Sequence, residues 1–255
     1  MIISIIFLLL SGFFIGSFLN VVIDRIPRNE SFLFGRSHCE LCQHILQWYD
    51  LMPLVSFLLL KGRCRYCQKV IGYQYPLVEL TTGILFVGNF LLFVHAPLLT
   101  IILSFCLISA SIVIFFTDIW FGIIPDVAIG FAGVVTVVVF LLQKEPLLPH
   151  FIGFLVSGLF FFSLWFATKQ KGMGFGDVKL SSFLGFLLGV PFLIPAFYIA
   201  FLTGASIALI LIIIRRKHLK GDTLPFGPFL IVGGLVAFYW GNALWQFFTK
   251  IILHL

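Results

Sequence analysis

Four of the five cysteines occur as two Cys-x-x-Cys pairs in one polar stretch, Cys39 with Cys42 and Cys64 with Cys67. Each pair lets two thiolates face one point, and two such pairs supply the four soft ligands that structural Zn²⁺ prefers. The spacer between the pairs is slightly longer than the usual roughly 15–20 residues, and free or redox-active thiols are the alternative. The spacing predicts a structural zinc site, because four thiolates leave no coordination position open for catalysis.

Two aspartates could do acid–base chemistry. Asp118 directly follows the apolar run 98–117, and Asp177 lies beside Gly174 and Gly176. Carboxylates at membrane depth are costly and therefore point to function. When two of them approach closely, both cannot easily ionise, so one can serve as general base on water and the other as general acid. The glycines would let a substrate backbone approach. The residues alone leave open a plainer reading, in which both aspartates are interfacial and paired with lysine or arginine.

The remaining carboxylates give less indication of a catalytic role. Glu79 is the third carboxylate at the end of an apolar run. Asp126 follows Pro125 at the start of an expected helix, where we interpret it as a helix cap. The others lie in polar loops. The fifth cysteine, Cys106, is alone in an apolar run and is interpreted as a small buried residue.

The elements that must position these groups are membrane helices. Hydrophobic residues make up 61% of the 255 residues and charged residues only 10%, against roughly 25% charged in soluble domains. The apolar runs are continuous, which disfavours a membrane β-barrel with alternating strands. The sequence therefore predicts an all-α polytopic membrane protein.

Six runs are candidates for single membrane spans, which need roughly 20 residues. The first lacks a basic flank and a cleavage site, so we expect a retained helix rather than a signal peptide. The run 180–214 is too long for one span, and Gly189-Val190-Pro191 offers a break within it. Together they predict about eight transmembrane helices. The six single runs are 2–23, 77–94, 98–117, 127–142, 151–167 and 229–248.

Charge sets the orientation. Loops 24–76, 168–179 and 215–228 hold all of the 16 lysines and arginines except Lys144 and Lys250. The positive-inside rule places these loops, and with them 118–126, in the cytoplasm and both termini outside. Thiols stay reduced there, which favours metal binding over disulfides.

The expected organisation has three parts. Residues 1–23 form the first transmembrane helix, 24–76 a cytoplasmic zinc-binding loop, and 77–255 a membrane domain of about seven helices. Within the loop, the apolar stretch 51–60 is too short to span and is expected to form an interfacial or packed helix.

Taken together, the motifs resemble the prepilin (type IV leader) peptidase family of membrane aspartic proteases. Two departures stand out: Glu40 where the family usually has proline, and Gln74 where arginine is common. The segments that carry the resemblance are Gly16-Ser17-Phe18-Leu19-Asn20-Val21-Val22, Arg25-Ile26-Pro27, Arg36-Ser37 before the first cysteine pair, Trp48-Tyr49-Asp50 with Pro53, Gly62-Arg63-Cys64-Arg65, Tyr75-Pro76-Leu77-Val78-Glu79, Asp118 through Asp126, Gly172 through Lys179, and Leu224-Pro225-Phe226-Gly227-Pro228.

The resemblance implies that Asp118 and Asp177 are the catalytic pair and that Gly174, Gly176 and Lys179 belong to the active-site loop. It implies a multi-pass protein of the bacterial cytoplasmic (inner) membrane. The expected partner is the lipid bilayer, and no nucleic acid is expected to bind. The implied substrates are type IV prepilins or pilin-like proteins of secretion and DNA-uptake systems. Many members also N-methylate the new terminus with S-adenosylmethionine.

Two other functions fit parts of the pattern. A transporter could use the intramembrane carboxylates as a proton relay, although it would not need the cysteine loop. A structural subunit of a secretion machine is the second alternative. No Gly-x-Gly-x-x-Gly loop follows a strand, so the residues themselves predict no Rossmann-type site for S-adenosylmethionine.

Overall fold

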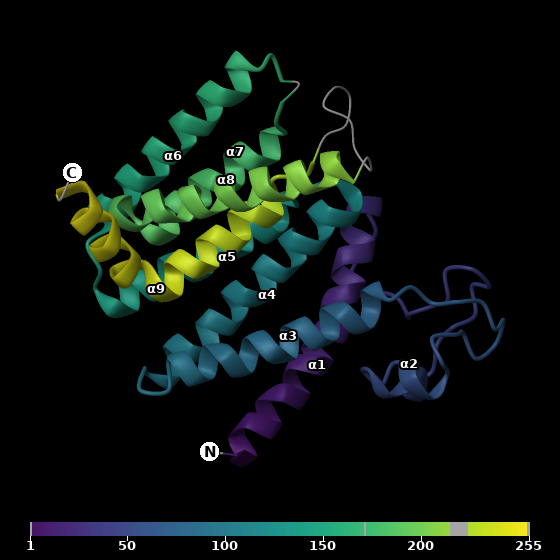
Figure 1. Ribbon diagram of the computed structural model, residues 1–255. Helices are drawn as coiled ribbons and strands as arrows, with labels where there is room; N and C mark the ends of the chain where they lie inside the picture. Colours follow the sequence, from purple (N-terminus) through teal and green to yellow (C-terminus); the bar gives the residue numbers. More distant parts are fainter. Residues whose placement is uncertain (1, 171, 215–223, 254–255) are drawn as a thin grey trace. The chain divides into compact units, whose positions relative to one another are not determined.

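The computed structural model describes residues 2–170, 172–214 and 224–253 (Figure 1). These residues form helices and contain no strand, which confirms the predicted all-α class. The chain divides into two compact units, residues 1–116 and 117–255. The helices are α1 (Ile2–Arg25), α2 (Val55–Leu59), α3 (Gln74–Leu92), α4 (Leu98–Phe121), α5 (Asp126–Gln143), α6 (Leu147–Ala167), α7 (Phe175–Leu188), α8 (Val190–Ile213) and α9 (Gly227–Leu253).

Among the described residues, seven helices are long and apolar enough to cross a membrane: α1, α3, α4, α5, α6, α8 and α9. They correspond to the six predicted single runs and to the second half of the run 180–214. Residues 215–223, most of the predicted basic loop 215–228, lie outside the described residues, as does Lys171.

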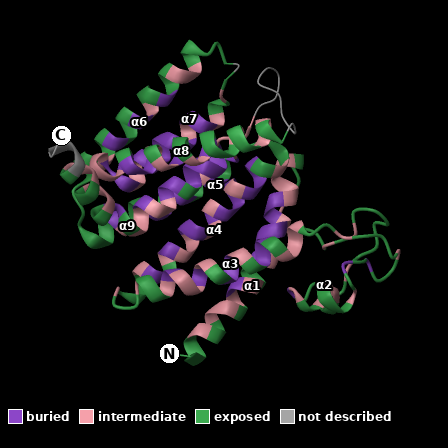
Figure 2. Cartoon of the chain, viewed as in Figure 1, coloured by how far each residue is buried: buried purple, intermediate pink, exposed green. Residues whose placement is uncertain are grey.

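The long run breaks where the sequence predicted. Gly189 has a φ of +73°, a backbone conformation that glycine adopts without steric cost. It separates α7 from α8. With 14 residues, α7 is about 21 Å long at 1.5 Å per residue, which is shorter than the roughly 30 Å hydrocarbon core. It is also buried on most sides (Figure 2), because it contacts α5, α6, α8 and α9.

Two glycines allow α6 and α7 to cross closely. A methyl group at Gly185 would lie 2.3 Å from the carbonyl oxygen of Gly153, far inside van der Waals contact. Small residues at such crossings let backbones touch, as in many membrane helix pairs. The crossing holds α7 in the middle of its unit.

In the first unit, α1 packs along α3 in the same manner. A methyl group at Gly12 would lie 2.6 Å from the Cα atom of Gly83, and one at Gly16 would lie 2.7 Å from the Cα atom of Glu79. Gly12 and Gly16 form a Gly-x-x-x-Gly pattern, which is typical of close membrane helix contacts. The crossing fixes the two ends of the intervening loop beside each other.

The loop between α1 and α3 contains little regular structure. The helix expected over residues 51–60 is shorter than predicted and comprises only α2. It ends just before Lys61 and Gly62, which have φ values of 52° and 68°. A left-handed backbone at two successive residues ends a right-handed helix.

Candidate active site and metal centre

Asp118 lies in the last turn of α4 rather than in a loop after it. The helix continues to Phe121 and ends before Gly122, whose φ is +65°. The predicted end at residue 117 was wrong, because a single polar residue does not terminate a helix. The side chain of Asp118 is buried, with 5% of the residue exposed.

The start of α9 meets this carboxylate. The Gly227 amide donates a hydrogen bond of 2.9 Å to Oδ2 of Asp118. A methyl group at Gly227 would lie 2.5 Å from the same oxygen, so a larger residue would displace the carboxylate. Sequence reasoning included Gly227 in a motif but did not recognise it as a site residue. The signal available was Gly227-Pro228, since proline is favoured in the first turn of a helix.

Asp177 lies in the first turn of α7, and 6% of it is exposed. Its Oδ2 accepts a hydrogen bond of 3.2 Å from the Gly174 amide, as in one half of a capping box. Its Oδ1 is buried, and among the described residues no hydrogen-bond partner reaches it. Such an orphaned oxygen is costly and is found where a proton, water or substrate group completes the site.

Asp118 and Asp177 both belong to the second unit. Ile124 links their surroundings: a methyl group at Gly176 would lie 3.0 Å from its Cβ, and one at Gly227 would lie 3.1 Å from its Cδ1. The structure thus brings the start of α7, the start of α9 and the end of α4 to one place.

Gly174 and Gly176 serve different purposes here. Gly174 precedes α7 with an extended backbone (φ −75°, ψ 150°) and supplies its amide to Asp177. Gly176 leaves room for Ile124. Neither glycine has a left-handed backbone, so the requirement at Gly176 is for space rather than for conformational freedom.

Lys179 points to a different carboxylate. Its Nζ lies 2.7 Å from Oδ1 and 2.8 Å from Oδ2 of Asp126, and 5.5 Å from the centre of the Phe175 ring. The interpretation of Asp126 as a helix cap was wrong: Pro125 occupies the N-cap position, and no side-chain cap is present. Asp126 instead pairs with Lys179 and so connects the start of α5 to α7.

The cysteine pairs form two turns of the same design. In the first, the Cys39 amide donates to the His44 carbonyl, and the Gln43 amide donates to the Cys39 carbonyl. Cys64, Gln68 and Lys69 repeat both hydrogen bonds in the second turn. Gln43 and Gln68 have left-handed φ values of 59° and 58°. Each turn therefore folds back so that both of its thiols face the same side.

The four sulfurs form one cluster, all within 4.8 Å of one another. Cys39 Sγ and Cys67 Sγ, which come from different turns, are 3.9 Å apart. Tetrahedral zinc with Zn–S bonds of about 2.3 Å requires sulfurs about 3.8 Å apart. The cluster therefore fits a four-thiolate metal site as it stands. His44 is not part of it, and its ring packs on Tyr66 at a centroid distance of 3.6 Å.

Asp50 supports the second turn. Its carboxylate accepts a hydrogen bond of 2.7 Å from Arg65 and one of 3.1 Å from the Tyr66 hydroxyl. Burial acts to raise the pKa of Asp50, but the hydrogen bonds from Arg65, the Gln47 amide and Tyr66 together hold its pKa below the usual value. The turn is thus held from outside by a carboxylate that stays ionised.

Comparisons with known proteins agree with this arrangement. The bacterial peptidase A24 N-terminal domain matches residues 10–93, and the type IV leader peptidase family matches residues 105–209. The chain is 32% identical over 248 residues to the prepilin leader peptidase/N-methyltransferase of Bacillus subtilis (strain 168), covering 96% of this chain and 98% of that protein. No solved structure is significantly similar to the chain.

Two further relatives carry the same description. The protein of Aeromonas salmonicida (strain A449) is 32% identical over 273 residues, covering 94% of this chain and 91% of the relative. That of Xanthomonas campestris pv. campestris is 32% identical over 265 residues, covering 91% and 90%. The resemblance seen in the motifs is confirmed along nearly the full chain, and the chain is a multi-pass membrane protein that belongs to the type IV leader peptidase family.

Proposed function

We propose that this protein is an endopeptidase of the bacterial inner membrane that removes the leader of type IV prepilins or pilin-like proteins. Asp118 and Asp177 carry the reaction at the cytoplasmic membrane boundary. The supporting observation is the pair itself: two buried carboxylates at helix ends of one unit, one of which has an oxygen that no hydrogen-bond donor of the described residues reaches.

The surroundings of the two aspartates give them different roles. Each aspartate accepts one amide hydrogen bond at a helix start, Asp118 from Gly227 and Asp177 from Gly174, so a helix dipole favours a negative charge on both. They differ at Oδ1 of Asp177, which has no hydrogen-bond partner among the described residues. We therefore assign the proton to Asp177 and the role of ionised general base to Asp118. A proton on the orphaned Oδ1 of Asp177 removes the cost of burying a second charge. Asp118 takes a proton from water as the water oxygen attacks the scissile carbonyl. Asp177 gives its proton to the leaving amine as the C–N bond breaks.

Prepilins suit an active site at the cytoplasmic membrane boundary. A prepilin has a short basic leader followed by an apolar helix. That helix can lie in the membrane beside the enzyme's spans, which leaves the scissile bond at the boundary. We extend the proposal to pseudopilins and competence pilins, which have the same leader-plus-helix design.

Zinc is the metal that we propose for the cysteine cluster, in a structural role. We further propose that the protein transfers a methyl group from S-adenosylmethionine to the new N-terminus, the second activity in the names of its relatives. Zinc would fold the loop, and S-adenosylmethionine would supply the methyl group.

The peptidase proposal is tested with purified protein in detergent or lipid vesicles and a panel of prepilin and pseudopilin substrates. We expect at least one substrate to be shortened by its leader, as measured by mass spectrometry. Proton flux through vesicles without cleavage of any substrate would favour the transporter alternative instead.

The proposed topology places residues 24–76, 118–126, 168–179 and 215–228 in the cytoplasm. An epitope inserted after Lys144, between α5 and α6, should be reached by antibody in intact spheroplasts. The same epitope after Lys169, between α6 and α7, should be reached only after permeabilisation, because basic loops resist translocation. The reverse pattern would contradict the proposed orientation.

A further inference from the structure

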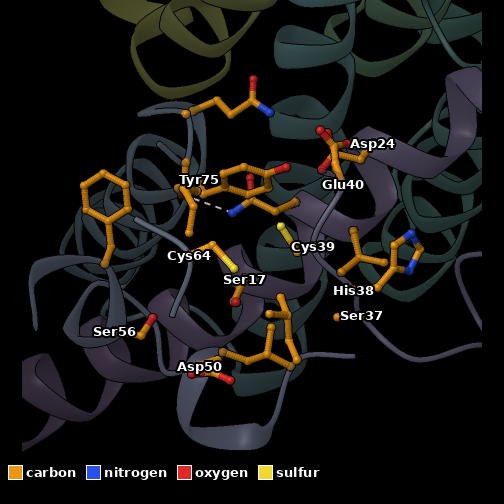
Figure 3. A pocket seen from close by; sticks show the side chains of 18 of the residues that line it. Ser17, Asp24, Ser37, His38, Cys39, Glu40, Asp50, Ser56, Cys64 and Tyr75 are labelled. Atoms are coloured by element: carbon orange, nitrogen blue, oxygen red, sulfur yellow. Dashed lines mark hydrogen bonds between the residues drawn. The ribbon is translucent and has the colours of Figure 1, made fainter. Parts of the chain in front are cut away.

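The cavity shown in Figure 3 is lined by residues of the first unit, at the end of α1, the start of α3 and the loop between them. Asp118 and Asp177 belong to the second unit. A side chain that positions this pair is therefore expected in the second unit, and Ile124 has the contacts for it. Ile124 lies in the short connection between α4 and α5 and is half-buried.

Ile124 contacts the start of α7. The three atoms nearest to a methyl group built on Gly176 all belong to Ile124: Cβ at 3.0 Å, Cδ1 at 3.3 Å and Cγ1 at 3.4 Å. The isoleucine side chain therefore packs directly against the bare Cα of Gly176. Asp177 is the next residue, so a movement of Gly176 moves that aspartate with it.

Ile124 also contacts the start of α9. A methyl group on Gly227 would lie 3.1 Å from Cδ1 of Ile124 and 2.5 Å from Oδ2 of Asp118. The Gly227 amide donates its hydrogen bond to that same oxygen. One side chain thus reaches both helix starts, with its Cβ at Gly176 and its Cδ1 at Gly227.

Ile124 and the start of α9 are both held in place. Pro125 is buried, and a proline disfavours helical conformations in the residue before it, which restricts the backbone of Ile124. Just before α9, the ring centre of Phe226 lies 5.1 Å from that of Phe201 in α8 and 6.2 Å from that of Phe161 in α6. A constrained side chain therefore packs against a helix start that is itself anchored.

We infer that Ile124 is a positioning residue of the peptidase site, which sets the spacing between the starts of α7 and α9 and thereby the alignment of Asp177 with Asp118. This inference rests on the proposed catalytic roles of the two aspartates. Ile124 has no group that can transfer a proton, so it acts through the backbone of the two glycines. Misplacing reacting groups by about 1 Å can slow a reaction about 10²-fold.

Leader cleavage by full-length protein in lipid nanodiscs tests this role, with rates normalised to folded, monodisperse enzyme. Ile124→Ala should lower kcat by about 10²-fold. KM should stay near the wild-type value, because the change moves reacting groups rather than removing a substrate contact. Ile124→Val removes only Cδ1 and should retain more activity. Ile123→Ala is the matched control: Ile123 is 44% exposed, and no atom of it is among the nearest to either glycine methyl, so cleavage should match wild type.

The pH profile supplies a readout that does not depend on the amount of folded enzyme. Loss of the side chain lets the starts of α7 and α9 approach each other, and carboxylates that approach interact more strongly. In Ile124→Ala the interval between the two limbs of the bell-shaped profile should therefore widen by about half a pH unit, as for an approach of about 1 Å at an effective dielectric constant of about 20. Ile123→Ala should leave the interval unchanged.

A double variant tests the contact itself. Gly176→Ala presses a methyl group against Ile124 and should slow cleavage, whereas Ile124→Ala removes two of the three atoms that this methyl group meets. Combined in one chain, the two changes should give cleavage about tenfold faster than the product of their separate effects, as expected for residues in contact.

Two outcomes would overturn this inference alone, with Asp118→Asn still impaired and the peptidase proposal intact. One is a wild-type kcat and pH interval in Ile124→Ala, and the other is strictly multiplicative effects in the double variant. If Ile124→Ala does not fold, the same comparisons are made with Ile124→Val, which lacks the atom that reaches Gly227. A wild-type protein that cleaves no prepilin would overturn the peptidase proposal and this inference with it.

Discussion

Asp118→Asn and Asp177→Asn should each reduce leader cleavage by about 10³-fold, within the roughly 10²–10⁴-fold contributed by a general acid or base. Each change keeps the size of the side chain but removes one member of the pair. Initial rates with a purified prepilin substrate would measure the loss. Because one aspartate must be ionised and the other protonated, wild-type activity should follow a bell-shaped pH profile. The apparent pKa values of its two limbs describe the coupled pair rather than either residue.

The matched control is Asp126→Asn. Asp126 is largely exposed, and its ion pair with Lys179 is of the surface kind, worth about 0.2–1 kcal/mol. Cleavage should therefore fall by no more than about fivefold. All three variants should remain inserted in the membrane with the metal bound. Cleavage at the wild-type rate by both Asp118→Asn and Asp177→Asn would refute the assignment, and loss of cleavage in Asp126→Asn alone would move the active site to that residue.

Cys64→Ser should release the metal and unfold the loop between α1 and α3. Cys64 is the one thiol of the four that is fully buried, and the loop has no other core of comparable strength. Binding of structural zinc supplies about 10–16 kcal/mol in isolated zinc-finger peptides, so its loss exceeds what short loop contacts can replace. Wild-type protein should contain about one zinc per chain by elemental analysis, the variant much less, and trypsin should cut the variant loop rapidly.

Cys106→Ser is the control, since Cys106 lies in α4 away from the four-thiol cluster. It should retain zinc and resist trypsin as wild type does. If wild-type protein contained no zinc and all four loop thiols were freely alkylated under native conditions, the metal assignment would be wrong. Free or redox-active thiols would then be the better reading.

Local composition made the membrane helices and the break at Gly189 predictable. Continuous apolar runs have few other structures open to them in a bilayer, because every backbone polar group must be satisfied internally. The ends of the helices were less predictable. Asp118 lies inside α4 because helices continue through isolated polar residues until the backbone reverses, as at Gly122.

Contacts between distant segments could not be read from the sequence. Nothing local to Gly227 indicates that its amide meets Asp118, more than one hundred positions earlier in the chain. The pairing of Asp126 with Lys179 was missed for the same reason. The cysteine spacing correctly predicted that the four thiols lie together, yet the repeated turn geometry became evident only from the left-handed backbone of Gln43 and Gln68.

The close crossing of α1 and α3 at Gly12 and Gly16 has a consequence for biosynthesis. These two helices leave the ribosome before α4 to α9, and multidomain proteins fold their N-terminal parts first during synthesis. We expect the crossing to form before any contact with those later helices. A bulkier residue at Gly16 would then act early in assembly, as failed helical-hairpin formation in the translocon, before α4 to α9 are made.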